Sequence, residues 1–225
     1  MSEALVVIPT YNEKENIERI IRTVFALHSD YHVLIVDDNS PDGTQEIVKH
    51  LQGEYEHKLF LLPRAGKQGL GTAYLAGFSW ALKKDYQFIF EMDADFSHDP
   101  KDLELLYKTC KEEKFGMAIG SRYVKGVNVV NWPMSRVLLS YFASRYVRII
   151  LSIPVEDTTA GFVCFRREVL EKMNFKKIRF VGYAFQIEMK FITHKLGFKI
   201  KEVPVIFTDR TLGTSKMSSG IINEA

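Results

Sequence analysis

The stretch Phe88-Ile-Phe-Glu-Met-Asp-Ala-Asp-Phe-Ser-His-Asp-Pro100 joins a short apolar run to two acidic residues and then to a proline. A run of this length, rich in aromatic and β-branched residues, is typical of a strand buried inside a sheet. Asp93 and Asp95 follow the run directly, where the strand would leave the sheet. The stretch therefore predicts a buried strand that presents two carboxylates at one sheet edge.

Three similar apolar runs precede this strand, and the four runs alternate with amphipathic segments. The apolar runs lie at 4–8, 33–36, 59–62 and 88–92, and the amphipathic segments at 15–27, 45–51, 71–82 and 101–111. This βαβα order predicts an α/β fold, with a mostly parallel sheet flanked by helices on both faces. Ligands of such sheets bind beyond the carboxyl ends of the strands, where the polar clusters of this chain stand.

The second half of the chain departs from this simple alternation. We expect a strand at 117–120, a long helix at 135–152, a strand near 162–165, a helix near 184–196 and an extended run from 199 to 207. The stretch 211–220 is rich in Gly and Ser, a composition that fits a closing loop and equally an ordinary exposed loop. No composition break divides the 225 residues, so we predict a single domain over 1–225.

The bulk composition excludes several classes of protein. A hydrophobic fraction of 46% and a charged fraction of 26% are ordinary for a globular protein. Thirty Lys and Arg against 28 Asp and Glu leave a net charge of +2, which argues against nucleic-acid binding. The two cysteines, Cys110 and Cys164, have no zinc or disulfide spacing, which fits a reducing, cytoplasmic setting. We see no secretion signal and no apolar run of the ~20 residues that span a bilayer, so any membrane contact should be peripheral.

The acidic residues at two strand ends suggest a nucleotide site. Asp93 and Asp95 could hold Mg²⁺ or Mn²⁺ together with diphosphate oxygens, although such a pair can equally cap a helix or solvate a loop. Asp37 and Asp38 end another strand, where a carboxylate could accept hydrogen bonds from a base or ribose. The alternative for this second pair is a turn in which Thr44 caps the next helix, and both interpretations can hold together.

Several motifs together resemble a known family. They are Pro9-Thr-Tyr-Asn-Glu13, Asp37-Asp-Asn-Ser-Pro-Asp42, Asp93-Ala-Asp-Phe-Ser-His-Asp-Pro100, Gly120-Ser-Arg-Tyr123, Trp132-Pro-Met-Ser-Arg136, Asp157-Thr-Thr-Ala-Gly-Phe162, Gly182-Tyr-Ala-Phe-Gln-Ile-Glu188 and Arg210-Thr-Leu-Gly-Thr-Ser-Lys216. The set resembles the family 2 glycosyltransferases of GT-A fold, which have a Rossmann-like nucleotide-binding sheet. Within them it most resembles the polyprenyl-phosphate mannosyltransferases, also called dolichol-phosphate mannose synthases. The resemblance covers essentially the whole chain.

The resemblance implies a donor half at about 1–115 and an acceptor half at about 116–225. The residues implied around the donor are Pro9, Tyr11, Glu13, Val36, Asp38, Asp93, Ala94, Asp95, Arg210 and Lys216. Asp93 and Asp95 would meet a Mg²⁺ or Mn²⁺ ion, with Asp95 the principal ligand. Many relatives have Gln where this chain has Ser97, so the pattern departs there.

The acceptor implied by the resemblance is a lipid phosphate, which is already ionised and needs no general base. Arg122, Arg136 and Ser140 would hold it, and guanidinium groups suit phosphate oxygens. The implied catalytic residues are Asp95, Arg122, Arg136 and, provisionally, Asp157. The resemblance implies that Asp157 and Glu188 could act as a base or as orienting groups, as acids near these positions could in relatives. The alternative is a structural acid that pairs with an arginine.

The helix expected at 135–152 is amphipathic. Its polar residues recur every four positions, at Arg136, Ser140, Ser144, Arg148 and Ser152, and its remaining surface holds Leu138, Leu139, Phe142, Tyr146, Ile149 and Ile150. Such a helix could lie in a membrane interface and bring the lipid to the site. The alternative is that its apolar face packs against the sheet.

The resemblance implies transfer of mannose from GDP-mannose to a polyprenyl (dolichyl) phosphate with inversion, at the cytoplasmic face of a membrane. A membrane-spanning partner subunit is a possible associate, as in some relatives. The alternatives are a polyprenyl-phosphate glycosyltransferase that uses a UDP-sugar, a phosphatase or nucleotidyltransferase on a similar sheet, and a non-catalytic nucleotide-binding subunit at membranes.

Overall fold

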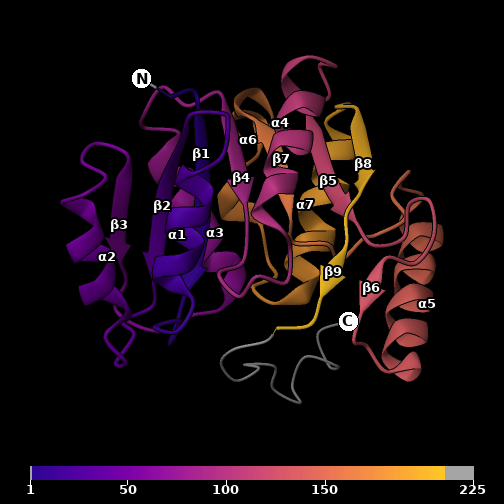
Figure 1. Ribbon diagram of the computed structural model, residues 1–225. Coiled ribbons are helices and arrows are strands. Elements are labelled where there is room, and N and C mark those ends of the chain that lie inside the picture. The colour runs from indigo at the N-terminus through magenta and orange to yellow at the C-terminus, as the bar shows by residue number, and fades with distance from the viewer. Residues whose placement is uncertain (1, 211–225) are drawn as a thin grey trace.

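A seven-stranded sheet forms the centre of the protein, and helices cover both of its faces (Figure 1). The computed structural model describes residues 2–210. The strand order is β3-β2-β1-β4-β7-β5-β8. These strands are β1 Ala4–Thr10, β2 Tyr31–Asp37, β3 Leu59–Pro63, β4 Phe88–Glu91, β5 Met117–Ser121, β7 Val163–Arg166 and β8 Ile200–Pro204. All the predicted strands are present in this sheet.

One strand runs against the others. β7 is antiparallel to both of its neighbours, β4 and β5, whereas every other pair in the sheet is parallel. The mostly parallel sheet predicted from the sequence is therefore confirmed, with β7 as its exception. Because β7 comes from the second half of the chain and pairs directly with β4, the two halves share one continuous sheet.

The helices divide between the two faces of the sheet. One buried cluster joins α1 (Ile17–Phe25), α2 (Thr44–Gln52) and α4 (Leu103–Lys111) to one face. A second joins α3 (Leu70–Ala81), α6 (Arg167–Lys172) and α7 (Tyr183–Lys195) to the other. Helix α3 approaches the sheet closely at Gly77, where an added Cβ would lie 2.4 Å from a methyl carbon of Val7. Only glycine fits there without displacing β1.

Several short elements were not predicted from the sequence. Strands β6 (Val129–Val130) and β9 (Phe207–Thr208) pair with each other in a separate two-stranded sheet. The 3₁₀ turns η1 (Pro100–Asp102) and η2 (Phe175–Lys177) and the six-residue helix α6 were also not predicted. Two to six residues are too few to show a hydrophobic period, which explains why these elements were missed.

The long helix α5 (Met134–Leu151) lies at the edge of the molecule (Figure 1). Ser144, in its polar row, is its one buried residue, and Arg136, Ser140 and Arg148 are half-buried. Seven of its apolar side chains are between 47% and 70% exposed: Met134, Leu138, Leu139, Phe142, Tyr146, Ile149 and Ile150. The interpretation that the apolar face packs against the sheet is therefore wrong, because that face points away from the protein.

In the described part of the chain, no helix combines the length and the apolar character needed to cross a bilayer.

Candidate functional site

Asp93 and Asp95 stand just beyond the carboxyl end of β4, as the sequence predicted. The Tyr74 hydroxyl, from α3, donates a hydrogen bond of 3.2 Å to Oδ1 of Asp93. Burial, and then repulsion by Asp95, raise the pKa of Asp93 to about 7. Two carboxylates that repel each other in this way favour a cation between or beside them.

Asp95 is held from two sides. Its Oδ1 accepts the Ser97 amide at 3.0 Å, and its Oδ2 lies 2.7 Å from Nη2 of Arg210. The intervening Phe96 has a φ of 60°, an unusual conformation for an aromatic residue, and its ring carries the Arg19 guanidinium at 4.2 Å. Backbone strain of this kind is found at ligand sites, and here it turns the Ser97 amide back onto Asp95.

The carboxylate pair fits a hard divalent cation. Mg²⁺ and Mn²⁺ take oxygen ligands, commonly one or two protein carboxylates completed by substrate phosphates. Within residues 2–210 no group of three or more His, Cys, Asp or Glu side chains could enclose an ion by itself. Asp93 and Asp95 could therefore hold a metal only together with ligands from a substrate or water.

The two acids at the end of β2 have different surroundings. Asp37 is fully buried, and its carboxylate accepts hydrogen bonds from Thr10, Ser40 and Gln45. Asp37 is therefore structural. Asp38 instead lies 3.2 Å from the Arg64 guanidinium, and burial raises its pKa against the opposing effect of Arg64.

The turn expected after β2 exists, but its details differ from the prediction. The N-cap of α2 is Gly43, at a φ of 93°, and not Thr44. The Thr44 hydroxyl donates to Asp42 and accepts the Glu13 amide at 3.0 Å. Thr44 therefore ties the turn to the segment after β1 rather than capping the helix.

The other residues predicted around the nucleoside gather near Asp38. Pro9 and Tyr11 are half-buried, and the Tyr11 ring lies 5.4 Å from Nζ of Lys67. Glu13 is buried and accepts from Asn16 at 3.0 Å. Val36, expected at the nucleoside, and Ala94, expected at the diphosphate, are both buried.

Arg122 makes a two-pronged ion pair with Asp157. Its Nε and Nη2 atoms lie 2.7 Å and 2.5 Å from the two carboxylate oxygens, and its backbone amide donates to Oδ2 at 2.9 Å. Burial would raise the pKa of Asp157, but the Arg122 charge and hydrogen bonds outweigh it, so this pKa is lowered. A carboxylate so engaged is a poor general base, and the arrangement is that of a structural acid paired with an arginine.

Arg122 and Arg136 approach the same indole. The ring centroid of Trp132 lies 5.5 Å from the Arg122 guanidinium and 3.9 Å from that of Arg136. Arg136 also pairs with Asp209 at 3.1 Å, and Ser140 lies one turn further along α5. The three residues predicted to hold an acceptor phosphate are thus on neighbouring segments, with two cations grouped around one aromatic ring.

An aromatic row connects the Asp95 segment to these arginines. Phe207, from β9, contacts the His98 ring at 5.0 Å and the Trp132 ring at 5.1 Å. The backbone of β9 is also bonded to both sides, from Thr208 to Ser97 and from Asp209 to Val130. Strand β9 therefore joins the acidic and basic parts of the site.

Other predicted residues lie elsewhere. Glu188 accepts the backbone amides of Arg179 and Phe180, so it supports a loop. Lys216 and the expected closing loop at 211–220 lie outside the described residues. Two contributors were missed: Arg64, whose Pro63-Arg64 position after β3 was a detectable signal, and Trp132, which belonged to a quoted motif but received no role.

The chain is similar to known proteins over nearly its whole length. The model of Glycosyl transferase family 2 matches residues 5–173. The polyprenol monophosphomannose synthase of Mycolicibacterium smegmatis is 45% identical over 221 residues, covering 98% of this chain and 83% of that protein. The undecaprenyl-phosphate mannosyltransferase of Micrococcus luteus is 42% identical over 221 residues, covering 98% of this chain and 90% of that protein.

Solved structures share the fold at low sequence identity. A mannosyltransferase from Pyrobaculum calidifontis, in complex with GDP-Man and Mn²⁺, matches with a TM-score of 0.64 and 17% identity over 95% of this chain. The chain spans 58% of that structure. Glucosyl-3-phosphoglycerate synthase from Mycobacterium tuberculosis, with Mn²⁺ and UDP, matches with a TM-score of 0.64 and 18% identity, over 94% of this chain and 72% of that one. The predicted GT-A fold is confirmed. Because the family model matches most of the chain and both curated relatives align over nearly all of it, the protein belongs to glycosyl transferase family 2.

Proposed function

We propose that this glycosyltransferase moves mannose from GDP-mannose to a polyprenyl phosphate, with inversion, to give a polyprenyl-phosphate mannose. The observation that carries the proposal is the pairing of Arg122 and Arg136 around Trp132, joined through β9 to the acidic pair Asp93 and Asp95. One end of the site suits a metal-bound diphosphate and the other suits an anionic acceptor. The names of the two curated relatives, a polyprenol monophosphomannose synthase and an undecaprenyl-phosphate mannosyltransferase, support the same substrates.

The acceptor end needs no general base. A lipid phosphate is ionised at neutral pH, so the protein's task is to position it and neutralise its charge. Arg122 and Arg136 would supply that charge, and Ser140 a hydroxyl donor. The engagement of Asp157 by Arg122 supports this reading, because Asp157 then orients a cation and abstracts no proton.

At the donor end, Asp93 and Asp95 would hold Mg²⁺ or Mn²⁺, and Arg210 stands beside them for the diphosphate. The ion, when bound, would supply Lewis-acid stabilisation of the leaving diphosphate. Lys216 is proposed for the same diphosphate. Pro9, Tyr11, Glu13, Val36 and Asp38 would surround the nucleoside.

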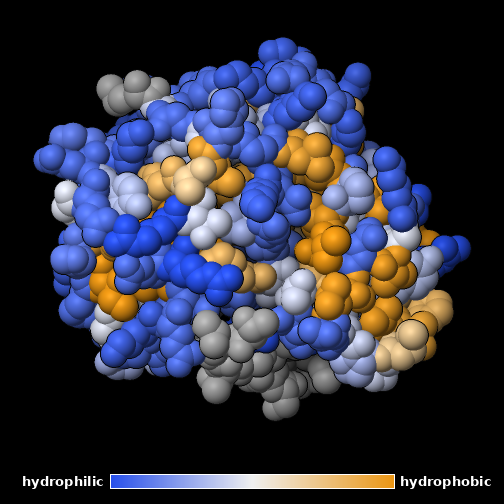
Figure 2. Space-filling model, viewed as in Figure 1, coloured by the Kyte–Doolittle hydropathy of each residue, from blue (hydrophilic) through white to orange (hydrophobic). Residues whose placement is uncertain are grey.

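We also propose that α5 rests on the membrane that contains the lipid acceptor. Figure 2 shows apolar side chains gathered at the right of the molecule, over the region of α5 in Figure 1. Arg136 and Ser140 belong to the same helix, so a membrane under its exposed face would bring lipid phosphates beside them. Cys110 and Cys164 are buried free thiols, which fits a cytoplasmic face. A membrane-spanning partner subunit stays a prediction.

The proposal is tested by incubating the protein with a short polyprenyl phosphate, Mn²⁺ and a panel of nucleotide sugars, followed by mass analysis of the lipid. We expect a lipid heavier by one hexose with GDP-mannose alone among the donors. If the lipid product forms only with a UDP-sugar, that sugar nucleotide and not GDP-mannose is the donor. Consumption of nucleotide sugar without any change in the lipid would reject the acceptor and favour a hydrolase.

A further inference from the structure

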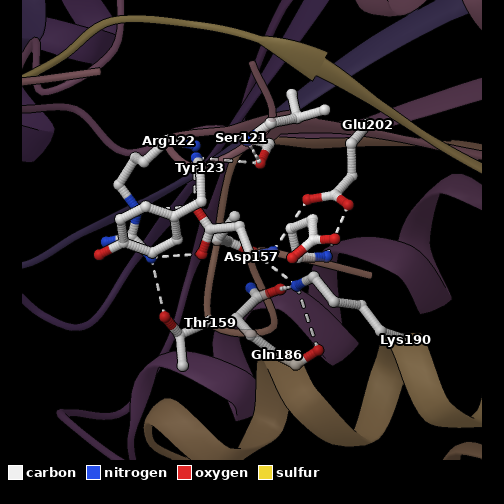
Figure 3. A network of polar contacts seen from close by, with 11 residues as sticks. Ser121, Arg122, Tyr123, Asp157, Thr159, Gln186, Lys190 and Glu202 are labelled. Atoms are coloured by element: carbon white, nitrogen blue, oxygen red, sulfur yellow. Dashed lines mark hydrogen bonds and ion pairs between the residues drawn. The ribbon is translucent and has the colours of Figure 1, made fainter. Parts of the chain in front are cut away.

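Behind the pair of Arg122 and Asp157 lies a second, buried polar layer (Figure 3). It is built on two residues one turn apart on α7, Gln186 and Lys190, which are 3% and 0% exposed. Both side chains are therefore inside the protein and are not solvated surface groups. Their polar atoms point into the space between α7, the end of β4 and the segment 156–161 that precedes β7.

Lys190 holds the segment that orients Arg122. Its Nζ donates to the Ala160 carbonyl at 2.7 Å and to the backbone and side-chain oxygens of Gln186 at 3.2 Å and 3.3 Å. The same segment contributes Asp157 and Thr159, and both of these accept hydrogen bonds from Arg122. Lys190 therefore fixes the backbone of segment 156–161 at Ala160, and Asp157 and Thr159 of this segment orient Arg122.

Gln186 links Lys190 to the strand that carries the acidic pair. Its Nε2 donates to Glu91 at 2.7 Å, and Glu91 is the last residue of β4, two positions before Asp93. Through one turn of α7, the strand that presents the acidic pair is thus linked to the loop that orients the arginine. The remaining end of the loop is held by Glu202, which accepts the amides of Glu156 and Asp157 at 2.6 Å and 2.9 Å.

A buried lysine is unfavourable for folding alone. Burial lowers the pKa of Lys190 to about 8; the Arg122 charge acts in the same direction, and Glu91, Asp157 and Glu202 oppose it. Removing an ammonium from water costs several kcal/mol, which an apolar side chain of the same volume would avoid. A charge placed there at such cost is best explained by the geometry that it imposes on its neighbours.

We propose that Lys190 and Gln186 are positioning residues that fix the Arg122 guanidinium at a set place relative to Asp93 and Asp95. The inference rests on the proposed role of Arg122 in binding the acceptor phosphate. Neither residue contacts a substrate. Lys190 acts on the reaction through the loop of Asp157, and Gln186 couples that loop to β4.

The test compares Lys190→Met with the wild type, using GDP-mannose, Mn²⁺ and a short polyprenyl phosphate. We expect kcat/KM for the acceptor to fall about 10–100-fold, because a small misplacement of a binding group has effects of this size. The dissociation constant of GDP with Mn²⁺, measured by calorimetry, should change less than about two-fold. Lys195→Met, the same change at an exposed position of α7, is the matched control and should alter neither quantity.

A double-mutant cycle with Arg122→Lys separates positioning from general damage. If Lys190 acts through Arg122, Lys190→Met should cost much less in the Arg122→Lys background than in the wild type. Equal losses in both backgrounds, a parallel loss of GDP affinity, or unchanged acceptor kinetics would each overturn the inference. Arg122→Lys with wild-type acceptor kinetics would instead reject the proposed role of Arg122 itself.

If Lys190→Met does not fold, Gln186→Met replaces it in the cycle. This variant keeps the approximate size of the side chain but removes its side-chain hydrogen bonds with Glu91 and Lys190. The same signature is expected, with a smaller loss of acceptor kcat/KM and a change of less than about two-fold in GDP affinity. Wild-type kinetics of Gln186→Met would overturn the inference.

Discussion

Asp95 accepts a backbone amide on one oxygen and faces a guanidinium on the other, and this predicts a specific cost for neutralising it. We expect Asp95→Asn to lower turnover about 10²–10³-fold, since removal of one positioned electrostatic group has that effect. The measurement is kcat in assays with buffered Mn²⁺. Asp99→Asn, at an exposed acid four residues further on, is the matched control. Full activity of Asp95→Asn would reject Asp95 as a ligand in the proposed metal site.

His98 makes the stability of the protein depend on pH. Burial, and then the Arg122 charge, lower the pKa of His98 from 6.5 to about 4. Between these values the unfolded chain binds a proton that the folded protein does not, so stability falls as the solution is acidified. From pH 6.5 to about pH 4.5 this one group should contribute a loss of about 2 kcal/mol.

His98→Phe tests this prediction, because phenylalanine keeps a ring that can stack on Phe162, where the His98 and Phe162 ring centroids are 4.8 Å apart. Urea unfolding at both pH values should show a smaller loss for the variant than for the wild type. The remaining buried histidine, His32, whose pKa is also lowered by burial, is the same in both proteins and cancels in the comparison. Equal losses of stability in the two proteins would show that folding does not lower the pKa of His98.

At the level of single residues, part of the candidate site could be predicted from the sequence. Asp93, Asp95 and Asp38 follow buried strands, and the strand rule places such residues at one edge. Arg64 and Trp132 were not assigned roles, because their importance depends on which partners they meet across the fold. No local pattern in the sequence states that Arg122 would share the Trp132 ring with Arg136.

Among the helices and strands, α5 is the one for which we predict membrane binding. Its exposed apolar face should bind a bilayer, and each large apolar side chain transferred from water contributes about 1.5–3 kcal/mol. We predict that Leu139→Glu combined with Phe142→Glu lowers binding to vesicles of polyprenyl phosphate and anionic phospholipid by at least about ten-fold. Turnover of a short, water-soluble polyprenyl phosphate should be nearly unchanged.

The control for α5 is Leu105→Glu, which places one glutamate at an exposed leucine of α4, and each single variant of α5 is compared with it. Co-sedimentation should be unaffected by this control. Unchanged vesicle binding by the double variant would reject α5 as the membrane contact. Loss of turnover on the soluble acceptor as well would point to damage at Arg136 or Ser140 and not to membrane release.

The period of α5 was predictable, but its orientation was not. Hydrophobic periodicity indicates that one face of a helix avoids water and does not say what covers that face. In α1 the apolar face meets the sheet, as usual. In α5 the polar row meets the protein instead, because Arg136 and Arg148 pair there with Asp209 and Glu156.

For the molecule as a whole, ligand binding should appear as added stability. A ligand at a hundred times its dissociation constant adds about 2.7 kcal/mol, or roughly 5–10 °C in Tm for a protein of this size. We predict this shift for GDP with Mn²⁺, and a smaller one for UDP with Mn²⁺, in differential scanning calorimetry. Chelation by EDTA should remove most of the GDP effect. A larger shift with UDP would reverse the donor assignment.

The overall architecture was predictable to the level of a mostly parallel sheet between helices. The direction of β7 was not, because a four-residue apolar strand has the same pattern in either direction. The direction is decided by the path of the chain from β5 through α5, which no local rule contains. This one reversal places a strand of the second half directly beside β4, which presents the acidic pair.

The adjacent residues Asp209 and Arg210 connect the two ends of the site with opposite charges, since Asp209 pairs with Arg136 and Arg210 with Asp95. If the donor and its metal bind at Asp95 and the lipid phosphate binds at Arg136, as proposed, each ligand would displace an ion pair made by one of these two adjacent residues. Whichever ligand arrives first should loosen the contact that the second must displace, so the two should bind with positive cooperativity. Thermodynamic linkage makes that advantage reciprocal, whichever order of addition the enzyme follows.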